Sequence, residues 1–190
     1  MLEIPLHGRQ PRRIFVNSMS DLIHQDVPLA YIEQVFDVMN SASWHQYQVL
    51  TKRSERLREI NTALKWQPQI WMGVSIENED YVFRAEDLRK TGAHVKFLSI
   101  EPLLGPLPHL KLHGIDWAIV GGESGPGARP VNPDWIRELR DRCVSKGVAF
   151  FFKQWGGVIK SRTGRLLDGR TWGEMPQESA HKLIKLCTAV

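Results

Sequence analysis

The sequence predicts an α/β protein built as an incomplete parallel βα barrel of about six strands. Short apolar runs recur along the 190-residue chain, and each ends in a polar residue. These polar residues stand 22 to 34 positions apart, which suits parallel βα units better than hairpins; they are Asn17, Thr51, Glu77, Glu101, Glu123 and Lys153. An open doubly wound sheet is the alternative, but such a sheet concentrates its chemistry at one switch point, whereas a barrel places polar groups at the end of each strand.

The N-terminal part of the chain predicts two βα units after a loose leader at residues 1–12, where prolines and a glycine interrupt any periodicity. The segment RIFVNSM at 13–19 is a predicted strand. A helix should start at Pro28 and bury one face, formed by Ile32, Val35, Phe36 and Met39. A second strand at 47–53 leads into a helix for which Ser54 is the predicted N-cap.

The middle of the chain continues the same alternation. A third strand at 71–78 precedes a helix at about 80–91, which should stop at Gly92 because glycine commonly follows the last turn of a helix. A fourth strand at 97–102 runs into the segment EPLLGPLPHLKLHG. Its three prolines leave no room for a regular helix, so an irregular crossover is expected there.

The C-terminal part begins with the stretch WAIVGGESGPGARP, where a fifth strand starts at Trp117 and ends in two glycines and a glutamate. A helix should start at Asn132-Pro133 and end near Gly147. The almost continuously apolar sixth strand, at 148–155, is expected to be covered on both faces. A hairpin is expected around the turn dipeptide at 168–169.

These elements predict one partial barrel domain at residues 1–177, with an extended tail from residue 156, followed by a short C-terminal helix at residues 178–190.

The composition is that of an ordinary soluble globular protein, with 42% hydrophobic and 24% charged residues. No apolar run reaches the roughly 20 residues of a membrane span, and the N-terminus has no signal-peptide core, so a cytoplasmic protein without membrane contact is expected. Two distant cysteines, Cys143 and Cys187, are expected to be reduced thiols. The net charge of +4 permits a nucleic acid or another phosphate-bearing partner without requiring one.

The glutamates at the strand ends are the strongest candidate functional residues. Glu77 and Glu101 each follow a serine by two positions, and Glu123 follows a glycine in the same way. Because side chains alternate along a strand, each pair shares one face, and the three carboxylates should converge at one rim. They could act as general acids or bases, bind a divalent cation, or simply form ion pairs with neighbouring lysines.

We therefore predict two sets of rim residues. The predicted catalytic residues are Glu77, Glu101, Glu123 and Lys153. The predicted substrate- or cofactor-binding residues are Asn17, Ser18, Asp21, Thr51, Lys52, Arg53, Ser75, Asn78, Ser99, Gly121, Gly122, Ser124, Arg129 and Gln154. Among them, Arg129 is the best candidate for a phosphate or carboxylate contact, because a guanidinium offers a fork of donors. No residues are assigned to a metal.

Seven stretches, in this order over about residues 12–176, carry a resemblance to a known family: RRIFVNSMSDLIHQDVP, YQVLTKRSERL, WMGVSIENED, FLSIEPLLGPL, IDWAIVGGESGPGARP, FFFKQWGG and LLDGRTWGEMP. They resemble a phage and prophage family of unknown function named after the gp thirty-seven and gp sixty-eight products. Members of that family typically begin with a strand and three closely spaced cysteines, which resemble the cluster-binding loop of radical S-adenosylmethionine enzymes. The resemblance implies a barrel with an iron-sulfur cluster and S-adenosylmethionine at the rim described above.

This sequence departs from the family pattern at the cluster. It has no cysteine before Cys143, so the three thiolates that would hold the cluster are missing. We therefore expect no cofactor for this chain by itself, and a barrel truncated before its first βα unit. An open barrel edge invites pairing with another copy, which predicts a homodimer.

Two functions from different classes remain open. The first is an enzyme of radical S-adenosylmethionine type, or the substrate-binding remainder of one. In it, the rim glutamates would hold polar groups of the cofactor or substrate. Carboxylate or phosphate groups would be held by Lys52, Arg53, Arg129 and Lys153. The second is a non-catalytic module that binds nucleic acid or a protein partner. A decayed prophage remnant without activity is a third, lesser alternative.

Overall fold

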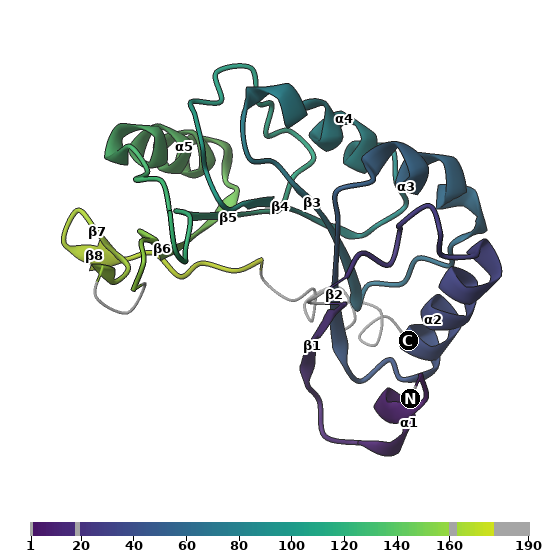
Figure 1. The fold of residues 1–190 in the computed structure, drawn as a ribbon. Coiled ribbons are helices and arrows are strands. Elements are labelled where there is room, and N and C mark those ends of the chain that lie inside the picture. Colours follow the sequence, from purple (N-terminus) through teal and green to yellow (C-terminus); the bar gives the residue numbers. More distant parts are fainter. Residues whose placement is uncertain (1, 18–19, 160–162, 177–190) are drawn as a thin grey trace, which may run out of the picture.

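The computed structural model describes residues 2–17, 20–159 and 163–176 and contains one six-stranded sheet in which all neighbouring strands are parallel. The strands follow one another in chain order: β1 (Arg13–Val16), β2 (Gln46–Thr51), β3 (Ile70–Ser75), β4 (Val95–Ile100), β5 (Trp117–Gly121) and β6 (Ala149–Gln154). The sheet curls into half of a barrel (Figure 1). The predicted incomplete parallel βα barrel is therefore confirmed.

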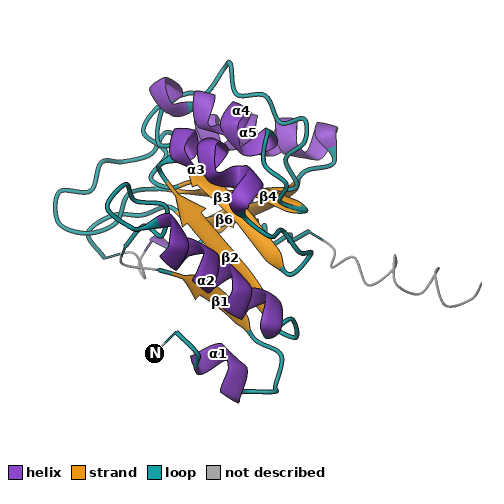
Figure 2. Ribbon diagram, turned by 90° about the vertical axis from the view of Figure 1, so that its right-hand side faces the viewer, coloured by secondary structure: helices purple, strands orange, loops and turns teal. Residues whose placement is uncertain are grey.

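Four helices connect the strands and lie along the convex side of the sheet (Figures 1 and 2); they are α2 (Leu29–Ser41), α3 (Ser54–Ile60), α4 (Phe83–Arg89) and α5 (Pro133–Lys146). Short 3-10 turns at Asn61–Ala63 and Glu79–Tyr81 complete the α3 and α4 connections. The crossover between β4 and β5 has no helix, as its prolines predicted. The main core lies between these helices and the sheet, and α2 buries the predicted apolar face.

The concave face of the sheet carries a second, aromatic cluster. Trp71, Phe97 and Trp117 are buried there, and the rings of Phe97 and Trp117 lie 5.8 Å apart. Gly73 makes this packing possible, because a Cβ atom at that position would lie 2.3 Å from the Phe97 ring. The segment after β6 crosses the cluster, where the Trp117 indole donates a hydrogen bond to the Glu174 carbonyl. The end of the half-barrel at which the strands begin is thus filled by side chains.

The predicted ends of the helix α5 and the predicted hairpin after β6 are confirmed. The Asn132 side chain accepts a hydrogen bond from the backbone of Asp134 and caps α5, and Gly147 ends that helix in the left-handed conformation. The hairpin turn at residues 168–169 connects β7 (Leu166–Leu167) to β8 (Arg170–Thr171).

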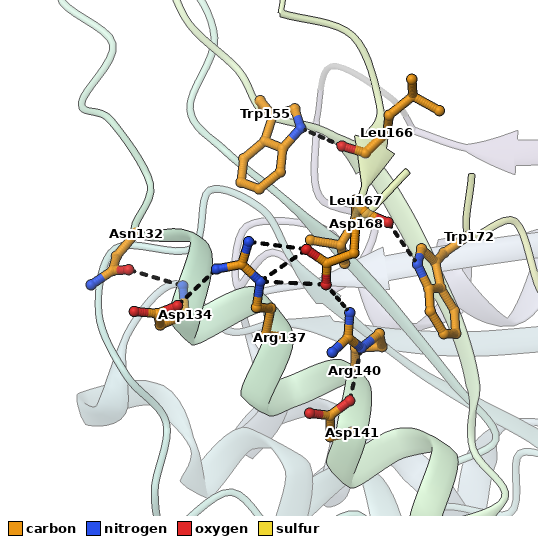
Figure 3. Close-up of polar contacts among 10 residues, drawn as sticks. All are labelled: Asn132, Asp134, Arg137, Arg140, Asp141, Trp155, Leu166, Leu167, Asp168 and Trp172. Atoms are coloured by element: carbon orange, nitrogen blue, oxygen red, sulfur yellow. Dashed lines mark hydrogen bonds and ion pairs between the residues drawn. The ribbon is translucent and has the colours of Figure 1, made fainter. Parts of the chain in front are cut away.

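The hairpin is fastened to α5 by a cluster of polar contacts, shown in Figure 3. The Asp168 carboxylate accepts hydrogen bonds from Arg137 and Arg140, which both lie on α5. The two guanidinium groups lower the pKa of Asp168. Trp155 and Trp172 donate their indole N–H groups to the carbonyls of the β7 residues. These contacts fix the segment after β6 against the body of the domain.

Two helix-end predictions were wrong because tertiary contacts decide these positions. Ser54 is the first residue of α3, and its hydroxyl donates to Asp87 on α4 at 2.8 Å instead of capping the helix. Gly92 lies beyond the end of α4, and its backbone N–H donates to Asn61. A Cβ atom there would lie 2.5 Å from the Trp66 ring, so this glycine permits a close approach and supplies no left-handed cap.

Two further expectations also differ from the structure. The predicted loose leader contains a short helix, α1 (Ile4–His7), which contacts α2. In β6, Phe150 and Phe152 are buried against the helices, whereas Phe151 on the concave side is only half-buried, so that face is incompletely covered.

The predicted C-terminal helix at residues 178–190 lies outside the described residues, and the division into 1–177 and 178–190 stays a prediction. None of the helices in the described ranges is long and apolar enough to cross a membrane.

The chain after β5 and the chain after β6 approach each other closely. The Gly122 N–H donates to the Gln154 carbonyl at 3.0 Å, and a Cβ atom on Gly122 would lie 1.9 Å from the Trp155 carbonyl oxygen. A backbone carbonyl cannot change rotamer as a side chain can. A methyl group on residue 122 would therefore force the loops after β5 and β6 apart.

We expect the substitution Gly122→Ala to lower the free energy of unfolding by about 1–3 kcal/mol, the usual cost of overpacking. Urea denaturation followed by circular dichroism measures this change. Gly105→Ala is the matched control, because a Cβ atom there meets nothing within 4 Å. Equal stabilities of the two variants would contradict the proposed close contact.

Candidate functional site

The three predicted glutamates lie at the carboxyl-terminal edge of neighbouring strands. Glu77 follows β3, Glu101 follows β4 and Glu123 follows β5. Since these strands are parallel and adjacent, their carboxyl ends meet at one edge of the sheet. Ser75 and Ser99 are register partners immediately before this edge. We call Glu77, Glu101 and Glu123, together with the side chains that bind them, the rim cluster.

Glu77 is the most buried carboxylate of the rim cluster and binds two cations. One of its oxygens lies 2.5 Å from Lys52 Nζ, after β2, and the other accepts from Arg84 of α4 at 3.1 Å. Arg84 also donates to the carbonyl of Ser75, so it connects the helix to the end of β3. The carboxylate and Arg84 are about 10% exposed, whereas Lys52 is 55% exposed. A buried carboxylate therefore has one buried partner and one that reaches it from solvent.

Glu101 has the same arrangement with partners on β6. Lys153 Nζ lies 2.7 Å from one carboxylate oxygen, and the Gln154 amide donates to the other at 2.9 Å. The same amide donates to the hydroxyl of Ser124. The Glu101 side chain is 16% exposed and Lys153 is 53% exposed. Gly121 has no side chain to fill the space beside this carboxylate, since a Cβ atom there would lie 3.1 Å from it.

Glu123 is held by one residue of the following loop. Arg129 binds it with two guanidinium nitrogens and its backbone N–H, at 2.8 to 2.9 Å. These hydrogen bonds to Arg129, first from the side chain and then from the backbone, lower the pKa of Glu123 to about 2. The predicted carboxylate contact of Arg129 is thus made to this chain's own glutamate. The pair closes the glycine-rich loop after β5.

Asp21 organises the side of the rim next to β2. It accepts hydrogen bonds from the Thr51 hydroxyl and from the backbone N–H of Lys52, the first at 2.7 Å. A further hydrogen bond from the Ile23 N–H holds Asp21 in place. Asp21 and Thr51 therefore support the chain that carries Lys52 to Glu77.

Several predicted binding residues lie elsewhere or have another role. Asn17 is exposed with a positive φ of 58° at the end of β1, and Asn78 caps the turn before α4. Arg53 is exposed, and no rim contact of its side chain occurs among the described residues. Gly122 makes room for the Trp155 carbonyl, which explains a glycine at this position without a ligand, so its binding role stays a prediction. Ser18 lies outside the described residues.

Sequence reasoning missed Arg84, the only arginine that the structure's described part places against Glu77. The available signal was its position next to Ala85 and Leu88, which are both buried in α4. An arginine on the apolar side of an amphipathic helix requires a buried acidic partner or carbonyl groups. That partner is Glu77, the carboxylate seven positions earlier.

No group of three or more histidine, cysteine, aspartate or glutamate side chains that could hold a metal ion occurs within residues 2–17, 20–159 and 163–176. Cys143 lies in the main core, and burial raises the pKa of its thiol to about 12. A thiol of this kind is a poor thiolate donor at neutral pH. The rim cluster is therefore a set of carboxylates paired with cations.

A separate cavity of about 660 Å³ lies away from the rim cluster. It is lined by α1, β1 and α2, and its walls are largely apolar, with Ile4, Phe15 and Tyr31 among them. Asn17 also lines it, which separates this residue from the glutamates with which it was grouped.

The Glu123–Arg129 pair predicts how the loop responds to acid. Because the pKa of Glu123 is lowered in the folded protein, the stabilisation by Arg129 is present above about pH 4.5 and is lost as the pH falls towards 2. Carbon NMR of the Glu123 carboxylate should show a midpoint near pH 2. Arg129→Gln should raise the midpoint towards 4.5, whereas Lys65→Gln, which removes a distant surface cation, should leave it unchanged. A midpoint near 4.5 in the unmodified protein would refute the pairing.

The comparisons with known proteins identify one family. No curated protein and no solved structure matches the sequence. The model of a family described as a protein of unknown function, DUF5131, matches residues 1–176, which is nearly the whole chain. The chain, an α/β half-barrel, therefore belongs to this family of unknown function.

Proposed function

We propose that the rim cluster binds a small zwitterionic ligand of the S-adenosylmethionine class, and that the chain is the ligand-binding part of a barrel enzyme. One observation carries the proposal: Glu77 and Glu101 are mostly buried, while the lysine bound to each is about half exposed. Each lysine reaches its carboxylate from solvent and can leave it when a ligand ammonium takes its place, so that the buried carboxylate always has a cation.

A zwitterion suits such a pair better than a simple cation or anion does. An incoming ammonium group can replace the Lys153 ammonium on Glu101, and the released lysine can bind the carboxylate of the same ligand. The number of ion pairs is conserved in this exchange, so no buried charge is left without a partner. The Gln154 amide nitrogen can keep its hydrogen bond to the other oxygen of Glu101 during the exchange.

Several residues around Glu101 are small. The residue beside the carboxylate is Gly121, and the positions just below the edge on β3 and β4 are the small residues Ser75 and Ser99. On the next two strands, larger residues stand at the same level, because Ile119 pairs with Ser99 and Phe151 pairs with Ile119. Barrel enzymes place their active sites at the carboxyl ends of the strands, where the rim cluster lies.

The iron-sulfur cluster implied by the family resemblance does not fit the residues of this chain. Its loop requires three thiolates, whereas this sequence contains two cysteines, of which Cys143 is buried with a raised pKa. We therefore assign no cluster chemistry to these residues. The phage or prophage association and the truncation relative to the family pattern stay predictions.

Nucleic-acid binding is the second candidate and has less support. Arg137, Arg140 and Arg142 form a basic row on α5, but the first two bind Asp168 and the third donates to carbonyl groups of the β4–β5 crossover. Guanidinium groups engaged in this way offer less to phosphate.

The test is isothermal titration calorimetry with S-adenosylmethionine. We expect measurable binding to the unmodified protein and at least about a tenfold weaker affinity for Glu101→Gln, because a hydrogen bond to a charged group contributes about 1.5–3 kcal/mol. Asp37→Asn is the control, since it removes a carboxylate from an exposed ion pair on α2. Adenosine, which lacks the zwitterion, should bind without any dependence on Glu101.

Two results would refute the proposal: no heat of binding at millimolar S-adenosylmethionine, or equal affinities of the Glu101→Gln variant and the unmodified protein. Binding of duplex DNA that falls steeply with salt, without S-adenosylmethionine binding, would favour the nucleic-acid alternative instead.

A further inference from the structure

Arg84 is a buried cation of the rim cluster that uses only part of its hydrogen-bonding capacity. Its side chain is 10% exposed. One guanidinium nitrogen, Nη1, makes both of its hydrogen bonds, to the Ser75 carbonyl at 2.8 Å and to the Glu77 carboxylate at 3.1 Å. The Tyr81 ring covers one face of the guanidinium, with the ring centroid 4.1 Å from the central carbon. The other two nitrogens, Nε and Nη2, have no hydrogen-bond partner among the described residues.

This unpaired edge of Arg84 is open to solvent. In the part of the chain that the structure describes, the fully buried side-chain nitrogens and oxygens without a partner are Gln48 Nε2, Glu79 Oε2 and Arg165 Nε. Nε and Nη2 of Arg84 do not belong to this group, so both still touch solvent. Arg84 is bound at the end of β3, which has a neighbouring strand on each side, so the opening does not lie at an outer edge of the sheet. Donors of a buried residue are almost always paired in folded proteins, so two unused donors indicate a partner that enters from solvent.

The unpaired edge has the geometry that an oxyanion requires. Nε and Nη2 donate in parallel from one edge of a guanidinium, which matches two oxygens of a carboxylate or a phosphate. This protein uses the same edge elsewhere, because Arg129 binds the Glu123 carboxylate through Nε and Nη2, each at 2.8 Å. Arg137 binds Asp168 through the same two nitrogens. Arg84 therefore offers a fork that this chain fills with carboxylates at two other places.

The charges around Glu77 also favour an anion. One carboxylate binds two cations there, Lys52 through one oxygen and Arg84 through the other. Asp21 pairs with neither cation, because its oxygens accept from a hydroxyl and from backbone N–H groups. Since Lys52 and Arg84 bind the same carboxylate, the lysine ammonium is held next to the guanidinium. An anion at this place would balance the second positive charge.

Lys52 can turn to such an anion without exposing a bare carboxylate. It is 55% exposed, and Glu77 keeps Arg84 when the lysine leaves. Lys153 lacks this freedom, because its departure leaves Glu101 with a neutral amide as its hydrogen-bond donor. A buried carboxylate without a cation is strongly unfavourable, so Lys153 needs a replacing ammonium and Lys52 does not.

We propose that the Nε–Nη2 edge of Arg84 and the ammonium of Lys52 form an oxyanion subsite of the rim, which binds a carboxylate or phosphate group of a second ligand. The fork of Arg84 holds two oxygens of that group, and Lys52 turns from Glu77 to bind it as well. The subsite goes beyond the proposed zwitterion site, because it is built from the contacts of Glu77 and not from those of Glu101.

Nitrogen-15 NMR of the Arg84 Nε–H group tests the subsite directly, because the chemical shift of this group changes when it donates to an oxyanion. Titration of the protein with inorganic phosphate, and separately with acetate, should move this signal, and the anion that binds more tightly identifies the group for which the subsite is built. Sodium chloride at the same ionic strength should leave the signal in place. The signal is identified by its loss in Arg84→Lys.

Two variants test the residues of the subsite. Lys52→Gln should bind phosphate about tenfold more weakly, because it removes a hydrogen bond from a charged donor. Lys65→Gln is the matched control, since Lys65 is an exposed lysine paired with Asp37 away from the rim, and it should bind phosphate like the unmodified protein. Arg84→Lys keeps a positive charge for Glu77 but lacks the fork, so it should lose phosphate binding. Circular dichroism checks that this buried variant folds, and the exposed position of Lys52 keeps the test decisive where it does not.

Three results would overturn the proposal: an Arg84 signal that moves with neither anion, a signal that moves equally with chloride, or equal phosphate affinities of Lys52→Gln and the unmodified protein. No S-adenosylmethionine is present in these titrations, so their outcome is separate from the calorimetry described above. Phosphate or acetate binding without S-adenosylmethionine binding would refute the zwitterion site alone, and the reverse result would refute the oxyanion subsite alone.

Discussion

The parallel register of β3, β4 and β5 is the constraint on which the rest of this molecule depends. Ser75 pairs with Ser99 in that register, so the residues two positions later, Glu77 and Glu101, leave the sheet at the same edge. A slip of β4 by one residue would turn Glu101 towards the main core and the apolar core residues of that strand towards the concave face. The packing of Phe97 against Gly73 makes such a slip costly, because a side chain in place of that glycine would clash with the ring.

Burial then decides how each rim carboxylate is satisfied. Glu77 has a buried partner, Arg84, which is fixed between α4 and the Ser75 carbonyl and cannot leave without abandoning two contacts. The lysines bound to Glu77 and Glu101 are about half exposed and reach these carboxylates from solvent. Glu123 differs from both, because Arg129 binds it with three hydrogen bonds from a single residue. The rim thus combines fixed partners with partners that reach it from solvent, and the proposed ligand exchange involves only the latter.

The sequence was sufficient wherever local chemistry decides the structure. Alternation and spacing predicted the six strands and their common polar edge, and Asn132 and Gly147 marked the ends of α5, because each satisfies backbone groups within a few residues. Prediction failed where a distant residue decides. Ser54 binds Asp87, and Gly92 lies against Trp66, two contacts that no pattern around either residue reveals. The role of Arg84 was missed for a related reason, since its charge was visible but its carboxylate partner was fixed only by folding.

The unequal edges of the sheet have a common physical origin in the curl of the half-barrel. A sheet that closes on itself satisfies both edges at once, whereas a half-barrel must satisfy each separately. At β6 the chain does so by folding back, and the Asp168 contacts with α5 keep the returning segment in place. At β1 no described residue pairs with the outer side of the strand, and α1 lies beyond the end of the strand (Figure 2). The backbone N–H and C=O groups on that side therefore depend on water, whereas those of β6 are satisfied by the chain itself, so the two edges of one sheet are satisfied in different ways.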